Sequence, residues 1–255
     1  MSPPLAILGD FGGGIEYLFR ERPSVGGDVM VGGVDRTLDF LVQHLQLSFL
    51  STLVAILLAL PVALVLGHLG RGELVASTVS NVGRAVPSLV LIALFFAFLG
   101  PGPTNVGLAL VLLAIPPLFT NAYVGIRQVD REVVDAARGM GYSDVQVLTR
   151  VELPMALPLI FGGIRTAAVS VVATATIAPL GGAESLGTPI IAIGVHGIQG
   201  AIGAAIAVAV LAVLCEVAFA ALQRAVTPRG LKLRSDAAHR RRAPFLSPGR
   251  KVSTA

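Results

Sequence analysis

Two long stretches of the chain, residues 41–70 and residues 85–126, contain no charged side chain. A soluble domain of this size would carry about twice the charged fraction of 13% found in these 255 residues. The mean hydropathy is +0.81. Since about 20 consecutive apolar residues are enough for a helix to cross a bilayer, both stretches predict membrane spans. The sequence therefore predicts an all-α membrane protein.

The hydrophobic pattern predicts five transmembrane helices. The stretch at 85–126 is too long for one helix, and the Gly-Pro-Gly-Pro sequence at 100–103 divides it. The expected spans are residues 41–70, a helix from near Thr78 to residue 99, and residues 105–126, 157–180 and 201–222. We expect Pro61 to kink the first span. We expect the glycine-rich segment 181–200 to lie outside the membrane or to re-enter it.

A polar segment separates the third and fourth spans and predicts two short helices joined at a turn. Asp130 is placed to cap the first helix, which Gly139 and Gly141 break. Ser143 and Gln146 have the spacing of a capping box that starts the second helix. Because proline lacks a backbone N–H, we expect the second helix to end at Pro154.

This segment resembles the cytoplasmic loop of ATP-binding cassette (ABC) importer permeases. The family pattern is Glu-Ala-Ala, then a Gly four residues after the second Ala, then a Leu-Pro whose Pro falls thirteen residues after that Gly. Asp135 takes the place of the Glu, which keeps the charge on a shorter side chain. The other matching residues are Ala136, Ala137, Gly141, Leu153 and Pro154. The alternative is an ordinary amphipathic surface loop, but six positions in one register favour the family loop.

The resemblance implies a role for the loop and a set of partners. In the family this loop is a coupling helix that docks into a groove on a separate ABC ATPase subunit. The chain would form one half of a translocation pore. Its other partners would be a second permease subunit, either the same chain or a related one, and an external substrate-binding protein.

Over residues 38–227 the chain is similar to the permeases of osmoprotectant uptake systems, which import glycine betaine, carnitine, choline or proline betaine. The matching sequences are QHLQLSFLSTLVAILLALPVALVLGH, GRAVPSLVLIAL, LAIPPLFTNAYVGIRQVD and LPMALPLIFGGIRTAAVSVVATATIAPLGG. The sequence GGAESLG departs from the Gly-Ala-Gly-Gly-Leu-Gly that the family more often has, through Glu184 and Ser185. The resemblance implies an ATP-driven importer of quaternary-ammonium osmoprotectants.

Two other functions are alternatives. An ABC permease for methionine or another amino acid would have a similar loop, so the loop does not separate the two substrates. An ion-coupled secondary transporter would typically have more spans, often as inverted repeats with intramembrane acidic residues. Five spans and the coupling loop argue against the secondary transporter.

The sequence shows no enzymatic site. It lacks the G-x-x-x-x-G-K-[ST] phosphate loop, so we expect ATP hydrolysis on a separate subunit. The single cysteine, Cys215, excludes an internal disulfide and a cysteine metal cluster. His196 has no second metal ligand near it in the sequence. We predict no catalytic residue, no metal site and no cofactor.

The aromatic content argues against a selective substrate site in this chain. A quaternary ammonium has no N–H to donate and is usually held between aromatic faces. The chain has no Trp and three Tyr, of which we expect only Tyr123 in or near the membrane. We therefore leave the substrate-binding residues unassigned and expect the selective cage on the external binding protein. Should a cage exist here, Tyr123 and Phe119 are the first candidates.

The basic residues predict the orientation of the chain in the membrane. Arginines follow the first and third spans, and the chain from Arg224 onward holds nine basic residues and one acid. Segments 100–104 and 181–200 contain no Lys or Arg. By the positive-inside rule, we expect a multi-pass protein of the cell (plasma or inner) membrane with its N-terminus outside and its C-terminus cytoplasmic.

Three regions follow from this orientation. Residues 1–43 form an external N-terminal segment, residues 44–226 the ABC importer transmembrane domain, and residues 227–255 a basic cytoplasmic tail. A basic tail could bind nucleic acid, but one next to a span is better explained as an anchor near anionic lipid. We predict the lipid bilayer as a partner and no nucleic acid.

Two charges within the predicted spans suggest an intramembrane ion pair. Arg165 lies eleven residues after Pro154, and Glu216 lies eight residues before Arg224. Because the fourth and fifth spans run in opposite directions, the two side chains should lie at similar depths from the cytoplasmic boundary. An unpaired charge at such depth costs at least ~2.5 kcal/mol. We therefore predict that Arg165 and Glu216 pair. The pair would either hold the fourth and fifth spans together or face the pore and break during the transport cycle.

Overall fold

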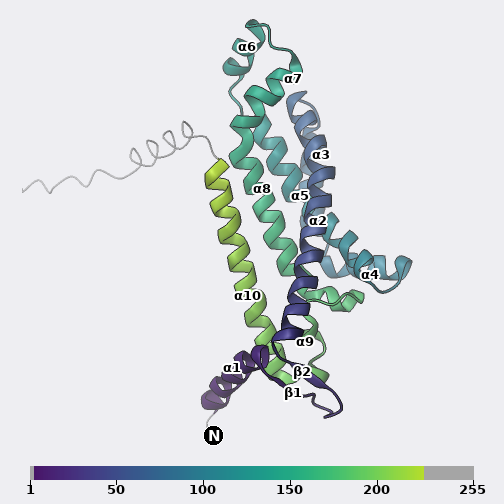
Figure 1. The fold of residues 1–255 in the computed structure, drawn as a ribbon. Helices are drawn as coiled ribbons and strands as arrows, with labels where there is room; N and C mark the ends of the chain where they lie inside the picture. Colours follow the sequence, from purple (N-terminus) through teal and green to yellow (C-terminus); the bar gives the residue numbers. More distant parts are fainter. Residues whose placement is uncertain (1–2, 227–255) are drawn as a thin grey trace, which may run out of the picture.

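Long helices run side by side along one axis in the computed structural model, which describes residues 3–226 (Figure 1). The predicted basic tail at 227–255 lies outside the described residues. In residues 3–226, four helical runs are long and apolar enough to cross a membrane: α2 (Val34–His68), α5 (Pro103–Arg127), the run Asp144–Gly181 that contains α8 (Leu153–Thr174), and α10 (Ile193–Val226). Helix α5 packs against both α2 and α8, and α8 packs against α10.

Small residues fill the contact between the first two of these helices. The buried residues Ala55, Ala59, Ala63 and Gly67 recur every fourth position of α2, which places them along one side of the helix. A Cβ atom on Gly67 would lie 3.0 Å from Cβ of Ile126 on α5. Small side chains let two helix backbones approach closely, which is how membrane helices gain packing energy.

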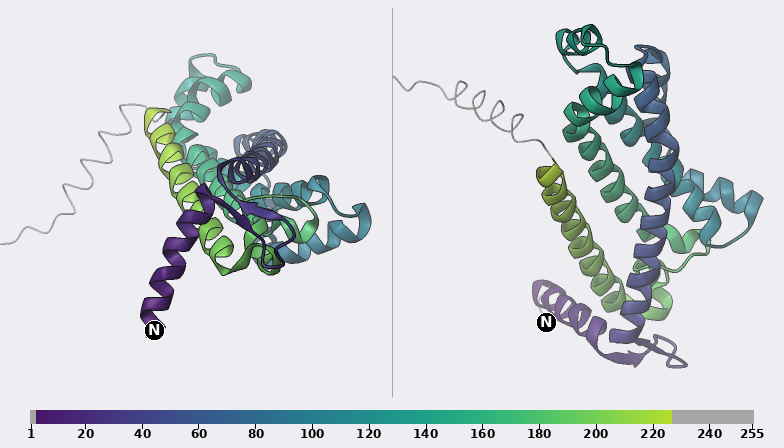
Figure 2. Two further views of the ribbon diagram at one scale, coloured as in Figure 1. Left: turned by 60° about the horizontal axis from the view of Figure 1, so that its bottom comes forward. Right: turned by 45° about the horizontal axis from the view of Figure 1, so that its top comes forward.

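The second predicted span is bent. Helices α3 (Glu73–Ala85) and α4 (Ser88–Leu99) are bent by 89° at their junction, and α4 points away from the bundle (Figures 1 and 2). Val86 is extended there, with φ −85° and ψ 117°, because the proline that follows it disfavours the helical conformation. We expected one helix from near Thr78, whereas the structure has two. The described residues provide the five expected spans when the bent pair counts as one.

The N-terminal segment covers the opposite end of the bundle from the polar loop. Helix α1 (Pro3–Phe19) packs against α10, and the strands β1 (Glu21–Pro23) and β2 (Met30–Gly32) pair antiparallel (Figure 2). The hairpin was not expected, because strands of three residues are too short to show a sequence period. Helix α2 begins at Val34, inside the segment that we expected to precede the first span.

Between α8 and α10 the chain turns back on itself. The 3₁₀ helix η2 (Ala175–Gly181) ends at Gly182, whose φ of +83° starts the loop before α9 (Thr188–Ile191). Asn105 fixes this turn, because its Nδ2 donates to the carbonyl oxygen of Gly181 at 2.9 Å. The glycine-rich segment 181–200 thus forms a loop, a short helix and the start of α10, which is kinked at the non-helical Gly197 (φ +69°, ψ 175°).

Candidate functional site

The polar segment between α5 and α8 forms a loop of two short helices beyond one end of the bundle (Figure 1). In the first, α6 (Arg131–Gly139), Asp130 caps the helix and accepts a hydrogen bond from the backbone N–H of Glu132 at 3.0 Å. The chain then turns at Gly141, whose φ is +87°. The predicted helix, its cap and the turn at Gly141 are confirmed, whereas Gly139, which we expected to break the helix as well, is its last residue.

The second short helix, α7 (Asp144–Val147), begins with the predicted capping box. Ser143 N donates to Gln146 Oε1 at 2.9 Å, and Gln146 N donates to Ser143 Oγ at 3.4 Å. The expected helix end at Pro154 is wrong. A π-helical turn, η1 (Leu148–Glu152), joins α7 to α8, so that Pro154 lies in the first turn of α8. The helix continues because the wider π turn accommodates the proline ring and its missing N–H.

The loop has a buried base and an apolar tip. Among the residues that match the family pattern, Asp135, Ala136 and Gly141 are exposed, Ala137 is buried, and Leu153 and Pro154 are half-buried. At the base, Ala137 packs with Val134 and Val147 in a small core. At the tip, Met140 and Val145 are 71% and 70% exposed. These two exposed apolar side chains are available for contact with a partner that docks on the loop.

Arg165 and Glu216 lie in contact. Arg165 Nη2, on α8, pairs with Glu216 Oε1, on α10. Gln223, also on α10, extends the contact, because its Nε2 donates to the Pro158 carbonyl oxygen at 2.8 Å and its Oε1 lies 3.5 Å from Arg165 Nη1. The structure therefore connects α8 and α10 through polar groups within an otherwise apolar contact. Gln223 was not predicted from the sequence, because an uncharged amide gives no signal of an intramembrane pair.

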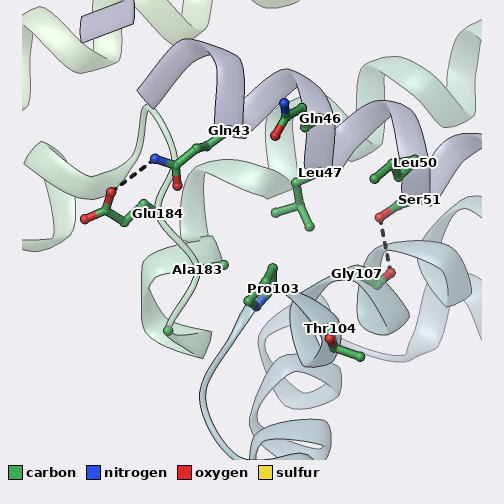
Figure 3. Close-up of a pocket in the computed structure, with 11 residues that line it drawn as sticks. Gln43, Gln46, Leu47, Leu50, Ser51, Pro103, Thr104, Gly107, Ala183 and Glu184 are labelled. Atoms are coloured by element: carbon green, nitrogen blue, oxygen red, sulfur yellow. Dashed lines mark hydrogen bonds between the residues drawn. The ribbon is translucent and has the colours of Figure 1, made fainter. Parts of the chain in front are cut away.

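An open hollow of about 630 Å³ lies at the end of the bundle away from the loop, between α2, the start of α5 and the segment after η2. We call it the outer hollow (Figure 3). Gln43 Nε2 donates to Glu184 Oε2 at 3.2 Å across one side of it, and Arg36 Nη2 lies 3.9 Å from Glu184 Oε1. Its lining consists of Gln43, Gln46, Leu47, Leu50, Ser51, Pro103, Thr104, Gly107, Gly182, Ala183 and Glu184. Among these described lining residues, none is aromatic.

The two aromatic candidates pack against each other on α5. The rings of Phe119 and Tyr123 are stacked, with centroids 6.5 Å apart and an angle of 8° between their planes. Both side chains are buried. Neither lines the outer hollow. The structure therefore does not bring them together with that hollow as an aromatic cage.

Comparison with known proteins connects this geometry to a family. Residues 51–231 match the model for the binding-protein-dependent transport system inner membrane component. The glycine betaine/carnitine/choline transport system permease protein OpuCB of Bacillus subtilis (strain 168) is 30% identical over 191 residues, which cover 74% of this chain and 88% of that protein. The osmoprotectant import permease protein OsmY of Salmonella typhimurium is 37% identical over 148 residues, covering 57% of this chain and 62% of that protein.

Solved structures share the fold. A chain of the MetNI methionine ABC transporter in an inward-facing conformation has a TM-score of 0.64 and 20% identity, covering 75% of this chain and 96% of that one. A chain of an amino acid ABC transporter crystallised with histidines has a TM-score of 0.58 and 22% identity, covering 73% and 90%. These likenesses establish an ABC permease fold for the helical bundle. This chain belongs to the family of binding-protein-dependent transport system inner membrane components, which are multi-pass membrane permeases.

Proposed function

We propose that this chain is the permease of an ATP-driven importer of quaternary-ammonium osmoprotectants, and that it forms half of the translocation pore. The observation that supports this most is the two-helix loop with its glycine turn and apolar tip, on a bundle 30% identical to an osmoprotectant permease over most of both chains. The pore is completed by a second permease subunit, identical or related. A separate ABC ATPase supplies energy, and an external binding protein supplies substrate.

We assign the loop end of the bundle to the cytoplasm. Arginines are more numerous at this end (Arg71, Arg127, Arg131, Arg138 and Arg150) than at the other (Arg20, Arg22 and Arg36), which favours the assignment under the positive-inside rule. The opposite end, with α1, the hairpin and the outer hollow, then faces outward. On this assignment residues 1–43 are external, residues 44–226 contain the transmembrane domain, and residues 227–255 are cytoplasmic.

In this orientation the α6–α7 loop is the coupling element. Met140 and Val145 fill apolar parts of a groove on the ATPase, while Asp135 makes an exposed polar contact worth about 1 kcal/mol. Asp130, Ser143 and Gln146 cap the two helices and keep the loop rigid, so that a movement of the ATPase is transmitted without bending.

The outer hollow is the place where substrate enters from the binding protein. Its lining, open to solvent, is aliphatic and polar with one carboxylate, Glu184, which Arg36 approaches to 3.9 Å, and it offers a quaternary ammonium no aromatic faces among the described lining residues. Contact there is therefore weak, and selection takes place on the binding protein. Weak contact suits a path that substrate must leave as easily as it enters.

Reconstitution of the complete transporter tests the proposal. Proteoliposomes that contain the permease, its cognate ATPase and the binding protein are supplied with labelled glycine betaine, choline, carnitine, proline betaine or methionine. We expect uptake of at least one quaternary-ammonium compound that requires ATP inside the vesicle. Uptake of methionine alone, or uptake driven by an ion gradient without ATP, would show that the proposal is wrong.

A further inference from the structure

Glu152 is a fully buried carboxylate at the base of the loop. Its side chain is 0% exposed, and it lies in the π turn η1 between α7 and α8. A carboxylate is almost never fully buried unless it is paired, because removing its charge from water is costly. A π turn within an α-helix is rare and is frequently found at functional sites. Glu152 therefore needs a partner. Its position in a π turn also suggests that it has a function beyond stabilising the fold.

Its partner comes from the first long helix. Glu152 Oε2 lies 2.6 Å from Nδ1 of His68, the last residue of α2, and the His68 side chain is only 9% exposed. The other ring nitrogen, Nε2, lies 3.9 Å from Asp144 Oδ1 on α7. The other carboxylate oxygen, Oε1, lies 3.9 Å from Arg131 Nη1 on α6. The pair thus joins α2 to the π turn η1, while Asp144 and Arg131 approach it from α7 and α6 without hydrogen bonding, and Oε1 of Glu152 has no hydrogen-bond partner among the described residues.

Helix α2 reaches from this pair to the outer hollow. Its 35 residues form one helix about 50 Å long, and Pro61, which we expected to kink it, lies inside the helix without interrupting it. At its outer end Arg36 and Gln43 contact Glu184, as described above. At its loop end Gly67 packs tightly against α5, next to His68. A shift of the loop that moves His68 therefore moves a continuous helix that borders the outer hollow.

We propose that the Glu152–His68 pair is the contact through which displacement of the coupling loop moves α2, so that both are positioning residues for ATP-driven transport. This inference rests on the proposed function. A buried contact between a carboxylate and an imidazole adds little to stability compared with apolar side chains of the same size. It does fix the position of His68 relative to Glu152, because a charge-assisted hydrogen bond holds its two groups at one distance and angle.

The test compares Glu152→Gln and His68→Gln with wild type in the reconstituted transporter. We measure assembly with the ATPase, ATP hydrolysis with substrate-loaded binding protein, and uptake per ATP hydrolysed. We expect assembly and ATP hydrolysis to persist, while uptake per ATP falls about tenfold, the scale of a coupling free energy between two sites. Glu73→Gln, which removes an exposed carboxylate at the same end of the bundle, is the control and keeps the wild-type ratio.

A second variant covers the case in which single replacements do not fold. Glu152→Leu together with His68→Leu leaves neither partner of the pair behind as an uncompensated charge, so it should assemble. We expect its uptake per ATP to fall as well. If the double variant keeps the wild-type ratio, the pair only stabilises the fold and the inference is overturned. Failure of wild type itself to show ATP-dependent uptake would instead refute the proposed function.

Discussion

At the scale of single residues, the turn of the α6–α7 loop, which we propose as the coupling element, depends on backbone conformation. A Cβ on Gly141 would meet no atom within 4 Å, so space does not exclude a side chain. The φ of Gly141, +87°, does exclude a β-branched side chain, because such a residue at positive φ is strained by about 1–3 kcal/mol. We expect Gly141→Val to insert normally and to abolish ATP-driven uptake. Gly139→Val is the control, since Gly139 is helical and equally unobstructed; equal uptake by the two variants would contradict the assignment of the loop.

The sequence predicts residues well where the signal is local. The glycine turn and the capping box could be recognised because each is set within a few residues of the chain. The Glu152–His68 pair could not, because its partners lie 84 residues apart and each resembles an ordinary polar residue at the end of a span. Arg165 and Glu216 were an exception, since charges inside apolar runs require partners and few were available.

At the scale of elements, the Arg165–Glu216 contact holds α8 against α10. We expect Arg165→Ala and Glu216→Ala each to lower the thermal stability of the purified protein, because each leaves an unpaired charge at a depth where it costs at least ~2.5 kcal/mol. The double variant should lose less than the sum of the two. Glu16→Ala, which breaks the exposed Arg20–Glu16 pair, should change stability little. Strict additivity of the two single losses would show that the contact contributes nothing.

Helices were easier to predict than their ends and directions. Charge-free runs mark the spans because hydrophobic length is what the bilayer demands. They do not show that Pro87 turns α4 by 89° away from α3, since the direction of a helix after a break depends on what it packs against. A proline alone also does not end a helix, because the chain remains helical from the π turn before Pro154 into α8.

At the scale of the whole molecule, the outer hollow exists only because α2, α5 and the segment after η2 meet there. No sequence pattern within any one of these segments indicates a hollow, so the position of the outer hollow was not predictable from the sequence. Its chemistry was in part predictable, because a chain without Trp and with three Tyr has few aromatic faces to offer a cation. The stacking of Phe119 on Tyr123 reduces that number further.

The lack of aromatic side chains around the outer hollow, among the described residues, predicts how the isolated permease binds substrate. Purified in detergent without its partners, it should show no saturable binding of labelled glycine betaine or choline in the micromolar range, because the described lining of the outer hollow provides no aromatic cage. Equilibrium binding measures this, and the external binding protein under the same conditions is the positive control. Saturable micromolar binding that Tyr123→Ala removes would mean that the stacked pair on α5 opens to hold the cation, and that selection is shared between the two proteins.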